Sequence, residues 1–317
     1  MKTFAMLFPG QGVQYINMLS SFFKKNNKIF EKKFHEASEY INYNLLSIFQ
    51  EKKNINNYQY IPLAILTSSI AIYEFWKEKN GPLPKLMSGH SLGEYSALVC
   101  SNAIKFRDAL KIVNLRSKLM QDVIINKPSL VLAIIGLEQM IVKDICSKYS
   151  PKIVSIASIN SEDEIIISGD KSAVYEAGKN CKKRGAHRIL KLNINIPIHS
   201  ILMKPIAKKL QVLLKKIKIK PPIIPVINNV DVICETNEKK IKNALIRQVY
   251  NTVRWKEIID LIKSKNILTM LEIGPNKILT NLVKKNKNIT ALNTNKLNSF
   301  LVALKKINMK NMKNKKK

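Results

Sequence analysis

The sequence predicts an α/β fold in which a large domain with a parallel sheet carries a small inserted α+β subdomain. Three apolar runs end at glycine-containing turns, and amphipathic helices separate them, as in parallel strands joined by helices. These runs are residues 3–8, 85–88 and 267–273. The middle of the chain instead has the order βαββαβ, which is the ferredoxin-like arrangement. We therefore expect residues 1–127 and 194–304 to form the large domain, and residues 128–193 to form the inserted subdomain.

The first half of the large domain alternates its strands with helices. The clearest helix covers residues 61–79, where apolar side chains recur from Leu63 to Trp76 before Gly81-Pro82 breaks the chain. The other helices expected here are residues 28–40, a segment that follows Gly93 through Cys100, and residues 106–122.

The rest of the chain contains the inserted subdomain and the second half of the large domain. The subdomain strands are expected at residues 130–136, 153–159, 164–168 and 186–192, and its helices at residues 138–149 and 171–184. Beyond it we expect a helix that ends near Lys216, an extended stretch at 221–227, and helices at 238–249 and 255–265. Residues 305–317 are mostly Lys, Asn and Met, and we expect a disordered tail there.

The charge of the chain is strongly basic. Its 317 residues carry a formal net charge of +32, but only six of the 54 basic residues are Arg. Nucleic-acid sites favour Arg because its guanidinium makes bidentate contacts. Lys, Asn and Ile share A/T-rich codons, so we attribute the composition to mutational drift and expect no nucleic-acid partner. A basic surface still attracts an acidic protein partner.

The sequence gives no sign of a membrane or a metal. It has no apolar run long enough for a membrane span, and its N-terminus lacks the pattern of a signal peptide. Its cysteines are scattered, without metal-ligand spacing, at Cys100, Cys146, Cys181 and Cys234. We expect a cytoplasmic monomer with free thiols and no membrane partner.

The run Gly89-His90-Ser91-Leu92-Gly93 has the pattern of a nucleophile elbow, a sharp turn between a strand and a helix. Such a turn lifts the Ser91 hydroxyl off the sheet and places it at a helix N-terminus, where developing negative charge is favoured. The N–H of Leu92 is then a natural donor to an oxyanion. This pattern indicates an α/β-hydrolase-like domain with serine chemistry on an acyl group.

Further blocks extend this pattern along nearly the whole chain. They are Phe8-Pro9-Gly10-Gln11-Gly12, Gly89–Val99, Leu115-Arg116 with Met120-Gln121, Asn228–Asp231, Arg247–Asn251 and Glu272–Pro275. In this order they resemble the bacterial malonyl-CoA:acyl carrier protein transacylases. The resemblance implies an acyltransferase that moves malonyl from malonyl-CoA to the phosphopantetheine thiol of acyl carrier protein, through a malonyl-serine ester, for fatty acid synthesis. It implies no bound cofactor.

A serine hydroxyl needs a base, and His199 is the candidate. The chain has four histidines, at His35, His90, His187 and His199. His35 and His187 lie among charged residues, and the His90 side chain should point away from the neighbouring hydroxyl. His199 matches the family's catalytic histidine. The resemblance also implies that the main-chain carbonyl of Gln248 orients this histidine, with an incidental Gln248 side chain, although the sequence does not exclude an aspartate.

Three further residues complete the expected site. Arg116 is the expected specificity residue, because a guanidinium holds a carboxylate with two parallel hydrogen bonds and malonate has the carboxylate that acetate lacks. Gln11, between two glycines, would offer its N–H as the second oxyanion donor. Asn160 matches a family asparagine near the acyl pocket.

Three other functions remain open on the sequence alone. A thioesterase-like serine hydrolase would use the same elbow but release malonate to water. A degraded, non-catalytic module would bind the carrier protein without turning over. Nucleic-acid binding depends on charge alone.

Overall fold

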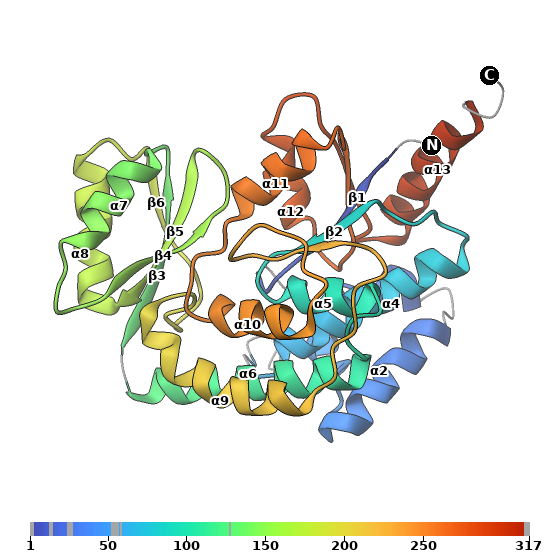
Figure 1. Cartoon of the computed structure of the whole chain (residues 1–317), viewed down its shortest axis with the longest axis horizontal. Coiled ribbons are helices and arrows are strands. Elements are labelled where there is room, and N and C mark those ends of the chain that lie inside the picture. Colours follow the sequence, from blue (N-terminus) through green and yellow to red (C-terminus); the bar gives the residue numbers. More distant parts are fainter. Residues whose placement is uncertain are drawn as a thin grey trace.

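A computed structural model of the chain describes residues 3–12, 15–23, 28–51, 57, 59–126 and 128–313. It contains two separate sheets (Figure 1). The larger sheet has the strand order β7-β2-β1-β8-β9, and all of its strand pairs are parallel. Its strands are β1 (Ala5–Phe8), β2 (Leu86–Gly89), β7 (Val226–Ile227), β8 (Thr269–Glu272) and β9 (Thr290–Asn293).

Strand β1 is buried on both faces, as expected for a parallel sheet covered by helices. Phe4, Met6 and Phe8 belong to the main core on one face, and Ala5 and Leu7 belong to a second cluster on the other. The main core is built around α4 (Ile61–Glu78), which is buried on nearly every side. A helix that is apolar all round must be covered all round, so α4 is the central helix of the large domain.

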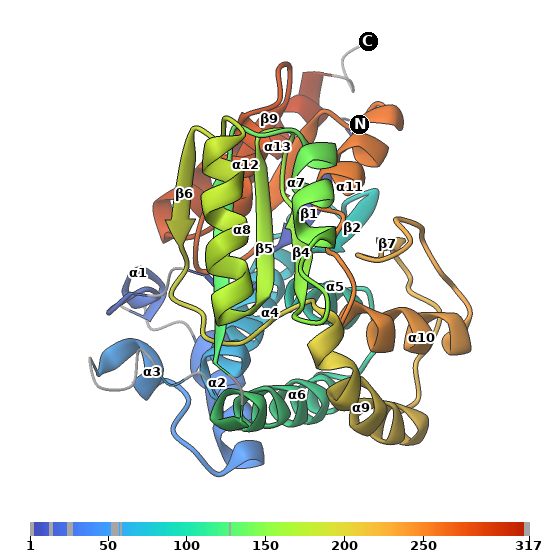
Figure 2. The ribbon, with the colours of Figure 1, turned by 90° about the vertical axis from the view of Figure 1, so that its left-hand side faces the viewer.

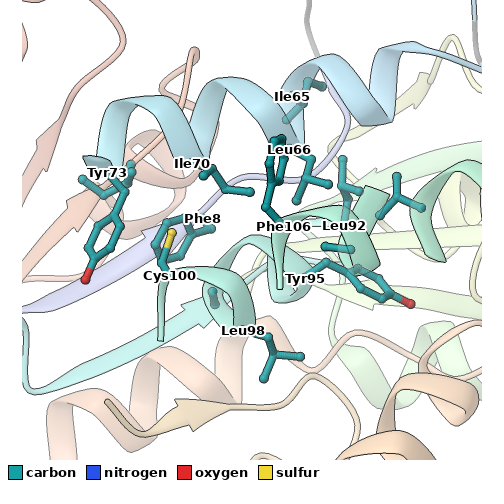
Figure 3. Packing of buried hydrophobic residues seen from close by; sticks show 14 of the residues in the cluster. Phe8, Ile65, Leu66, Ile70, Tyr73, Leu92, Tyr95, Leu98, Cys100 and Phe106 are labelled. Atoms are coloured by element: carbon teal, nitrogen blue, oxygen red, sulfur yellow. The ribbon is translucent and has the colours of Figure 1, made fainter. Parts of the chain in front are cut away.

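The nucleophile-bearing turn stands directly on this core. Helix α5 (Gly93–Cys100) follows the turn and lies beside α4, with Phe8, Ile70 and Tyr73 from one side meeting Cys100 from α5 (Figure 3). Leu92 and Tyr95, at the beginning of α5, are 1% and 0% exposed. The start of α5 is therefore fixed by packing, which leaves little freedom to the turn that precedes it.

The second sheet is antiparallel and has the order β4-β5-β3-β6. Its strands are β3 (Ser129–Ile135), β4 (Val154–Ile159), β5 (Glu164–Asp170) and β6 (Arg188–Lys191), and its helices are α7 (Gln139–Ser147) and α8 (Lys171–Lys183). Both helices cover one face of this sheet (Figure 2). The other face packs on Ile194 and Ile198, next to His199. This confirms the predicted fold class, with a ferredoxin-like unit beside the parallel-sheet domain.

The remaining predicted helices are present with small shifts at their ends. They are α2 (Lys28–Ile41), α6 (Phe106–Asn126), α9 (Lys204–Lys216), α10 (Glu238–Gln248) and α11 (Trp255–Ser264). Elements that the sequence analysis did not predict are α1 (Ser20–Phe23), α3 (Ser47–Gln50), the 3-10 turn Ile201–Met203, α12 (Ile278–Lys284) and β9.

The expectation of a disordered tail from residue 305 is wrong for most of that segment. Helix α13 runs from Leu297 to Lys313, and residues 314–317 lie outside the described part of the chain. Phe300, Ala303 and Ile307 recur at helical spacing and are buried in the main core. The Phe300 ring stacks on Phe75 at 4.7 Å. These apolar residues attach the helix to the domain, and Ile307 extends the attachment into the Lys/Asn-rich segment.

No helix in the described ranges is long and apolar enough to cross a membrane. All four cysteines are free, and Cys100, Cys146 and Cys181 are buried. Within the described residues no three His, Cys, Asp or Glu side chains gather in a way that could hold a metal ion.

Candidate active site

Ser91 lies at the predicted strand–turn–helix junction, between the end of β2 and the start of α5. Its φ angle is +52°, a left-handed conformation that is uncommon for a residue with a side chain. The flanking glycines permit this turn. A Cβ on Gly89 would lie 1.9 Å from the Gly93 carbonyl carbon, and one on Gly93 would lie 1.9 Å from the Phe8 oxygen. Only glycine fits at either position, which explains the spacing of the motif.

The loop after β1 lies against the elbow, because β1 and β2 are adjacent parallel strands. Phe8 is in register with Gly89, and the His90 N–H donates to the Phe8 carbonyl at 3.0 Å. The Phe8–Gly10 segment that precedes Gln11 thus packs against His90 and Gly93 of the elbow, which contains the other expected oxyanion donor, Leu92. Neither the Gln11 N–H nor the Leu92 N–H donates a hydrogen bond to another described residue. Their role as oxyanion donors stays a prediction.

The structure brings His199 to Ser91 over a separation of 108 residues. The distance between His199 Nε2 and Ser91 Oγ is 2.7 Å, and that between His199 Nδ1 and the Gln248 carbonyl oxygen is also 2.7 Å. A carbonyl only accepts, so Nδ1 carries the proton and Nε2 is free to accept from the serine hydroxyl. The group that orients the base is therefore a main-chain carbonyl, as the family resemblance implies.

Burial keeps His199 neutral. The residue is 3% exposed. Burial first, and then the nearby Arg116 charge, lower the pKa of His199 to about 3, although the hydrogen bond to the Gln248 carbonyl opposes the shift. His199 is thus an unprotonated base at every pH near neutrality.

Arg116, on α6, is a buried cation beside the nucleophile. It is 5% exposed, and its Nη2 donates to Ser91 Oγ at 3.3 Å. Burial lowers the pKa of the guanidinium. Its Nε has no hydrogen-bond partner, and no ion pair in the described part of the chain includes it. An unpaired buried guanidinium is costly, and an anionic ligand would offset that cost.

His90 and Asn160 lie together behind the elbow. The His90 ring points away from the Ser91 hydroxyl, as expected, and packs against Trp255 at 5.3 Å. His90 Nε2 lies 3.0 Å from Asn160 Oδ1 and 3.1 Å from Ser158 Oγ. The Asn160 amide nitrogen donates to Glu164 at 2.9 Å. Asn160 thus joins the inserted subdomain to the elbow, and its contact with an acyl group stays a prediction.

The other two histidines, His35 and His187, contact residues outside the active site. His35 is exposed and lies 3.3 Å from Glu39 on its own helix. The His187 ring lies against Gly136 of the inserted subdomain. His199 is therefore the histidine that meets Ser91.

Polar side chains beneath the elbow, which were not predicted from the sequence, support the turn. Asn229 Oδ1 accepts from the Ser91 N–H at 2.7 Å, and Glu94 accepts from the Asn229 N–H at 3.0 Å. The Gln248 side chain is not incidental, because its Nε2 donates to Glu94 at 2.7 Å and to the Ser91 carbonyl at 3.1 Å. Asn229 and Glu94 both lie in blocks that carry the family resemblance, and this was the available signal.

The Glu94 carboxyl is fully enclosed by these groups. It is 2% exposed. Burial raises the pKa of Glu94 to about 7, while the hydrogen bonds from Gln248 and Asn229 act in the opposite direction. Burial also raises the pKa of Glu272 to about 7. This carboxyl belongs to the last residue of β8 and accepts hydrogen bonds from the start of α12.

The fold and the Ser91–His199 pair define an enzyme of serine acyl chemistry, a class in which an activated hydroxyl accepts an acyl group at an elbow. The model of the acyl transferase domain family matches residues 5–307. The chain belongs to this family, and the resemblance seen in its motifs is confirmed.

Individual relatives agree over nearly the full length. The malonyl CoA-acyl carrier protein transacylase of Buchnera aphidicola subsp. Schizaphis graminum is 72% identical over 309 residues, covering 97% of this chain and 100% of the relative. The solved structure of the Coxiella burnetii malonyl CoA-acyl carrier protein transacylase has a TM-score of 0.93 at 35% identity, covering 96% and 98% of the two chains. A malonyl-transacylase solved in complex with a type II polyketide synthase acyl-carrier protein has a TM-score of 0.92 at 41% identity, covering 96% and 99%.

Proposed function

We propose that this protein transfers the malonyl group of malonyl-CoA to the phosphopantetheine thiol of acyl carrier protein, through a malonyl ester of Ser91, and so supplies fatty acid synthesis. The observation that carries the proposal is the contact of Ser91 Oγ with His199 Nε2 on one side and with a buried, unpaired Arg116 on the other. The names of the relatives support the same reaction.

In the loading step, Ser91 Oγ attacks the thioester carbonyl of malonyl-CoA while its proton passes to His199 Nε2. The carbonyl oxygen becomes an oxyanion, which the N–H groups of Leu92 and Gln11 would hold. The carbon–sulfur bond then breaks, and the imidazolium returns its proton to the leaving CoA thiolate. Malonyl-serine and free CoA result.

The transfer step reverses these roles. The phosphopantetheine thiol gives its proton to His199 Nε2 and attacks the ester carbonyl. The bond to Ser91 Oγ breaks, and the imidazolium reprotonates that oxygen. Every proton in both steps moves between the substrates, Ser91 and His199, so the proposal includes no bound cofactor. In both steps the Gln248 carbonyl at 2.7 Å stabilises the imidazolium that forms.

Arg116 supports the choice of a malonyl group. Its guanidinium already reaches Ser91 Oγ, so it lies within the length of a malonyl chain from the bond that forms. A carboxylate seated there would gain two parallel charge-assisted hydrogen bonds and would neutralise the buried cation.

The remaining parts of the proposal concern partners and place. We take acyl carrier protein to be the transient acidic partner, drawn by the net charge of +32. The four free thiols favour a reducing compartment, so we propose action in the cytoplasm. The Ser91–His199 dyad and Arg116 all belong to one chain, and we propose that a monomer is sufficient for activity.

Intact-mass measurement tests the reaction. Incubation with malonyl-CoA should add the mass of one malonyl group to the protein, and Ser91→Ala should abolish the gain. Ser101→Ala is the matched control, since Ser101 lies at the other end of α5 and its hydroxyl donates to the Leu98 carbonyl. Adding acyl carrier protein with its free thiol should move the mass to that protein. An adduct that is lost equally fast to water would indicate a hydrolase, and no adduct at all would overturn the proposal.

A further inference from the structure

Glu94 lies on the first turn of α5, three residues after the nucleophile, and touches no substrate in the mechanism above. One of its oxygens, Oε2, accepts two hydrogen bonds. The Gln248 Nε2 donor is at 2.7 Å and the Asn229 main-chain N–H is at 3.0 Å. These two donors are 19 residues apart in the sequence and 135 or more residues from Glu94. A single carboxyl oxygen therefore joins two distant segments beneath the elbow.

The first of these segments holds the nucleophile. The Asn229 side chain accepts from the Ser91 N–H at 2.7 Å and donates to the Gly89 carbonyl at 2.7 Å. It thus clamps the turn on both sides of His90. Because Ser91 has a φ of +52°, its conformation persists only if the surroundings hold it. The Asn229 side chain holds it through the Ser91 N–H, and Glu94 fixes the Asn229 main chain.

The second segment holds the base. Gln248 orients His199 through its carbonyl and bonds to the Ser91 carbonyl through its side-chain nitrogen. Three acceptors surround that nitrogen, whereas the Gln248 Oε1 atom has no partner. The amide is therefore oriented by acceptors on its nitrogen side alone, and the shortest of these bonds is the one to Glu94.

An ion pair outside the site ties the same two segments together. Arg247, the residue before Gln248, binds both oxygens of Asp231 at 2.8 and 2.5 Å. Asp231 lies two residues after Asn229. The ion pair thus links the two segments outside the site, and Glu94 links both of them to the helix that begins at the elbow.

We propose that Glu94 is a positioning residue of the acyl transfer reaction, which sets Ser91 and His199 relative to each other by holding Asn229 and Gln248. This inference rests on the proposed function. Glu94 replaces in part the alignment that a carboxylate bonded directly to the histidine gives in other serine enzymes. Here the Glu94 carboxyl does not contact the histidine. It acts through Gln248, which contacts both Ser91 and His199.

The test compares Glu94→Leu with Glu94→Gln. Leucine removes the acceptor, which leaves the Asn229 N–H without a partner and deprives Gln248 Nε2 of the shortest of its hydrogen bonds. Displacements of about 1 Å in a reacting pair cost about 100-fold in rate, so the malonyl loading rate constant should fall by about that factor. Binding of malonyl-CoA should change little, because Arg116 is not part of this network. Glutamine keeps an oxygen acceptor, with weaker bonds, and should recover the rate to within about tenfold of the original protein.

Glu272→Leu is the matched control. Glu272 is also buried, at 1% exposure, and accepts hydrogen bonds from the Leu279 N–H, the Thr280 N–H and the Thr280 hydroxyl. None of its partners touches Ser91 or His199. Its loss should lower the unfolding midpoint but leave single-turnover loading, measured per folded molecule well below that midpoint, close to the original rate.

A spectroscopic readout separates positioning from stability. The Nδ1 proton of His199 is hydrogen-bonded to Gln248, so its NMR signal should lie far downfield. We expect this signal to shift upfield or broaden in Glu94→Leu and to stay in place in Glu272→Leu. Should Glu94→Leu fail to fold, Asn229→Ala removes the Ser91 acceptor from the same network and should slow loading likewise.

Two results would overturn the inference while malonyl loading by the unchanged protein still supports the proposed function. In one, Glu94→Leu or its substitute Asn229→Ala loads malonyl at the original rate. In the other, Glu94→Leu and Glu272→Leu slow loading equally and leave the His199 signal unchanged. Absence of loading by the unchanged protein would instead refute the proposed function itself.

Discussion

Replacing Arg116 by Met should damage malonyl loading and stabilise the free protein at the same time. Methionine has a similar length and no charge. In the folded chain the guanidinium is 5% exposed, lacks a carboxylate partner among the described residues and leaves its Nε unbonded. It therefore destabilises the unliganded protein, and only a bound anion would offset its desolvation.

Both magnitudes follow from this environment. Two charge-assisted hydrogen bonds contribute about 1.5–3 kcal/mol each, so their loss removes about 3–6 kcal/mol from the loading transition state. At about 1.4 kcal/mol per factor of ten, malonyl loading should slow by about 10²- to 10⁴-fold. Acetyl-CoA has no carboxylate, so its slow loading should change far less. Removal of the buried charge should raise the free energy of unfolding by about 1–4 kcal/mol.

The assay is single-turnover loading from malonyl-CoA and acetyl-CoA, followed by intact mass, together with urea unfolding of the free protein. Arg107→Met is the control, because Arg107 lies on the same helix but its side chain is 69% exposed. It should alter neither loading nor stability appreciably. Equal losses with the two thioesters, or a less stable Arg116→Met protein, would refute the assignment of Arg116 as the carboxylate site.

Three other predictions concern protonation and charge. The His199 ring should stay unprotonated from about pH 7 down to about pH 5, because its pKa is lowered to about 3; ring NMR signals that shift with an ordinary histidine pKa near 6.5 would contradict this. The Glu272 carboxyl has a pKa raised from 4.5 to about 7, so its contribution to stability is complete below pH 4.5 and is lost as the pH rises to about 7, by about 3 kcal/mol. Glu272→Gln should therefore unfold in urea with a flatter pH dependence than the original protein, and parallel curves would count against the shift. Transfer to acyl carrier protein should slow as salt is added while transfer to a small uncharged thiol does not, since only the first uses attraction between charged surfaces; equal salt responses would exclude electrostatic docking.

The fold was predictable where local sequence determines it. The Gly89 and Gly93 spacing requires a tight turn whatever surrounds it, and the alternation of apolar runs with amphipathic helices predicts the parallel sheet. The second half of helix α13 was missed because residues 305–317 are mostly Lys, Asn and Met. Ile307 is the buried residue that continues the apolar face of Phe300 and Ala303 into this segment, and one such residue does not stand out among the polar ones.

Less of the active site than of the fold could be predicted from local sequence patterns. Ser91 follows from its motif, but His199 and the Gln248 carbonyl required the family resemblance, because bonds spanning 108 and 49 residues leave no local pattern. The network through Glu94 and Asn229 was missed for the same reason. Its bonds exist only after distant segments have packed, and a buried carboxyl looks in the sequence like any helical glutamate.

The spread of the dyad along the chain has a consequence during protein synthesis. Chains are made from the N-terminus, and Ser91 leaves the ribosome long before Gln248, which is 157 residues further along. A nascent chain, or a fragment cut before that point, holds a serine whose base is missing or unoriented. In such a chain the Ser91 hydroxyl has the weak reactivity of an ordinary serine and does not attack thioesters efficiently. The base can therefore be oriented toward Ser91 only after the segment that contains Gln248 has been made and has packed against the elbow.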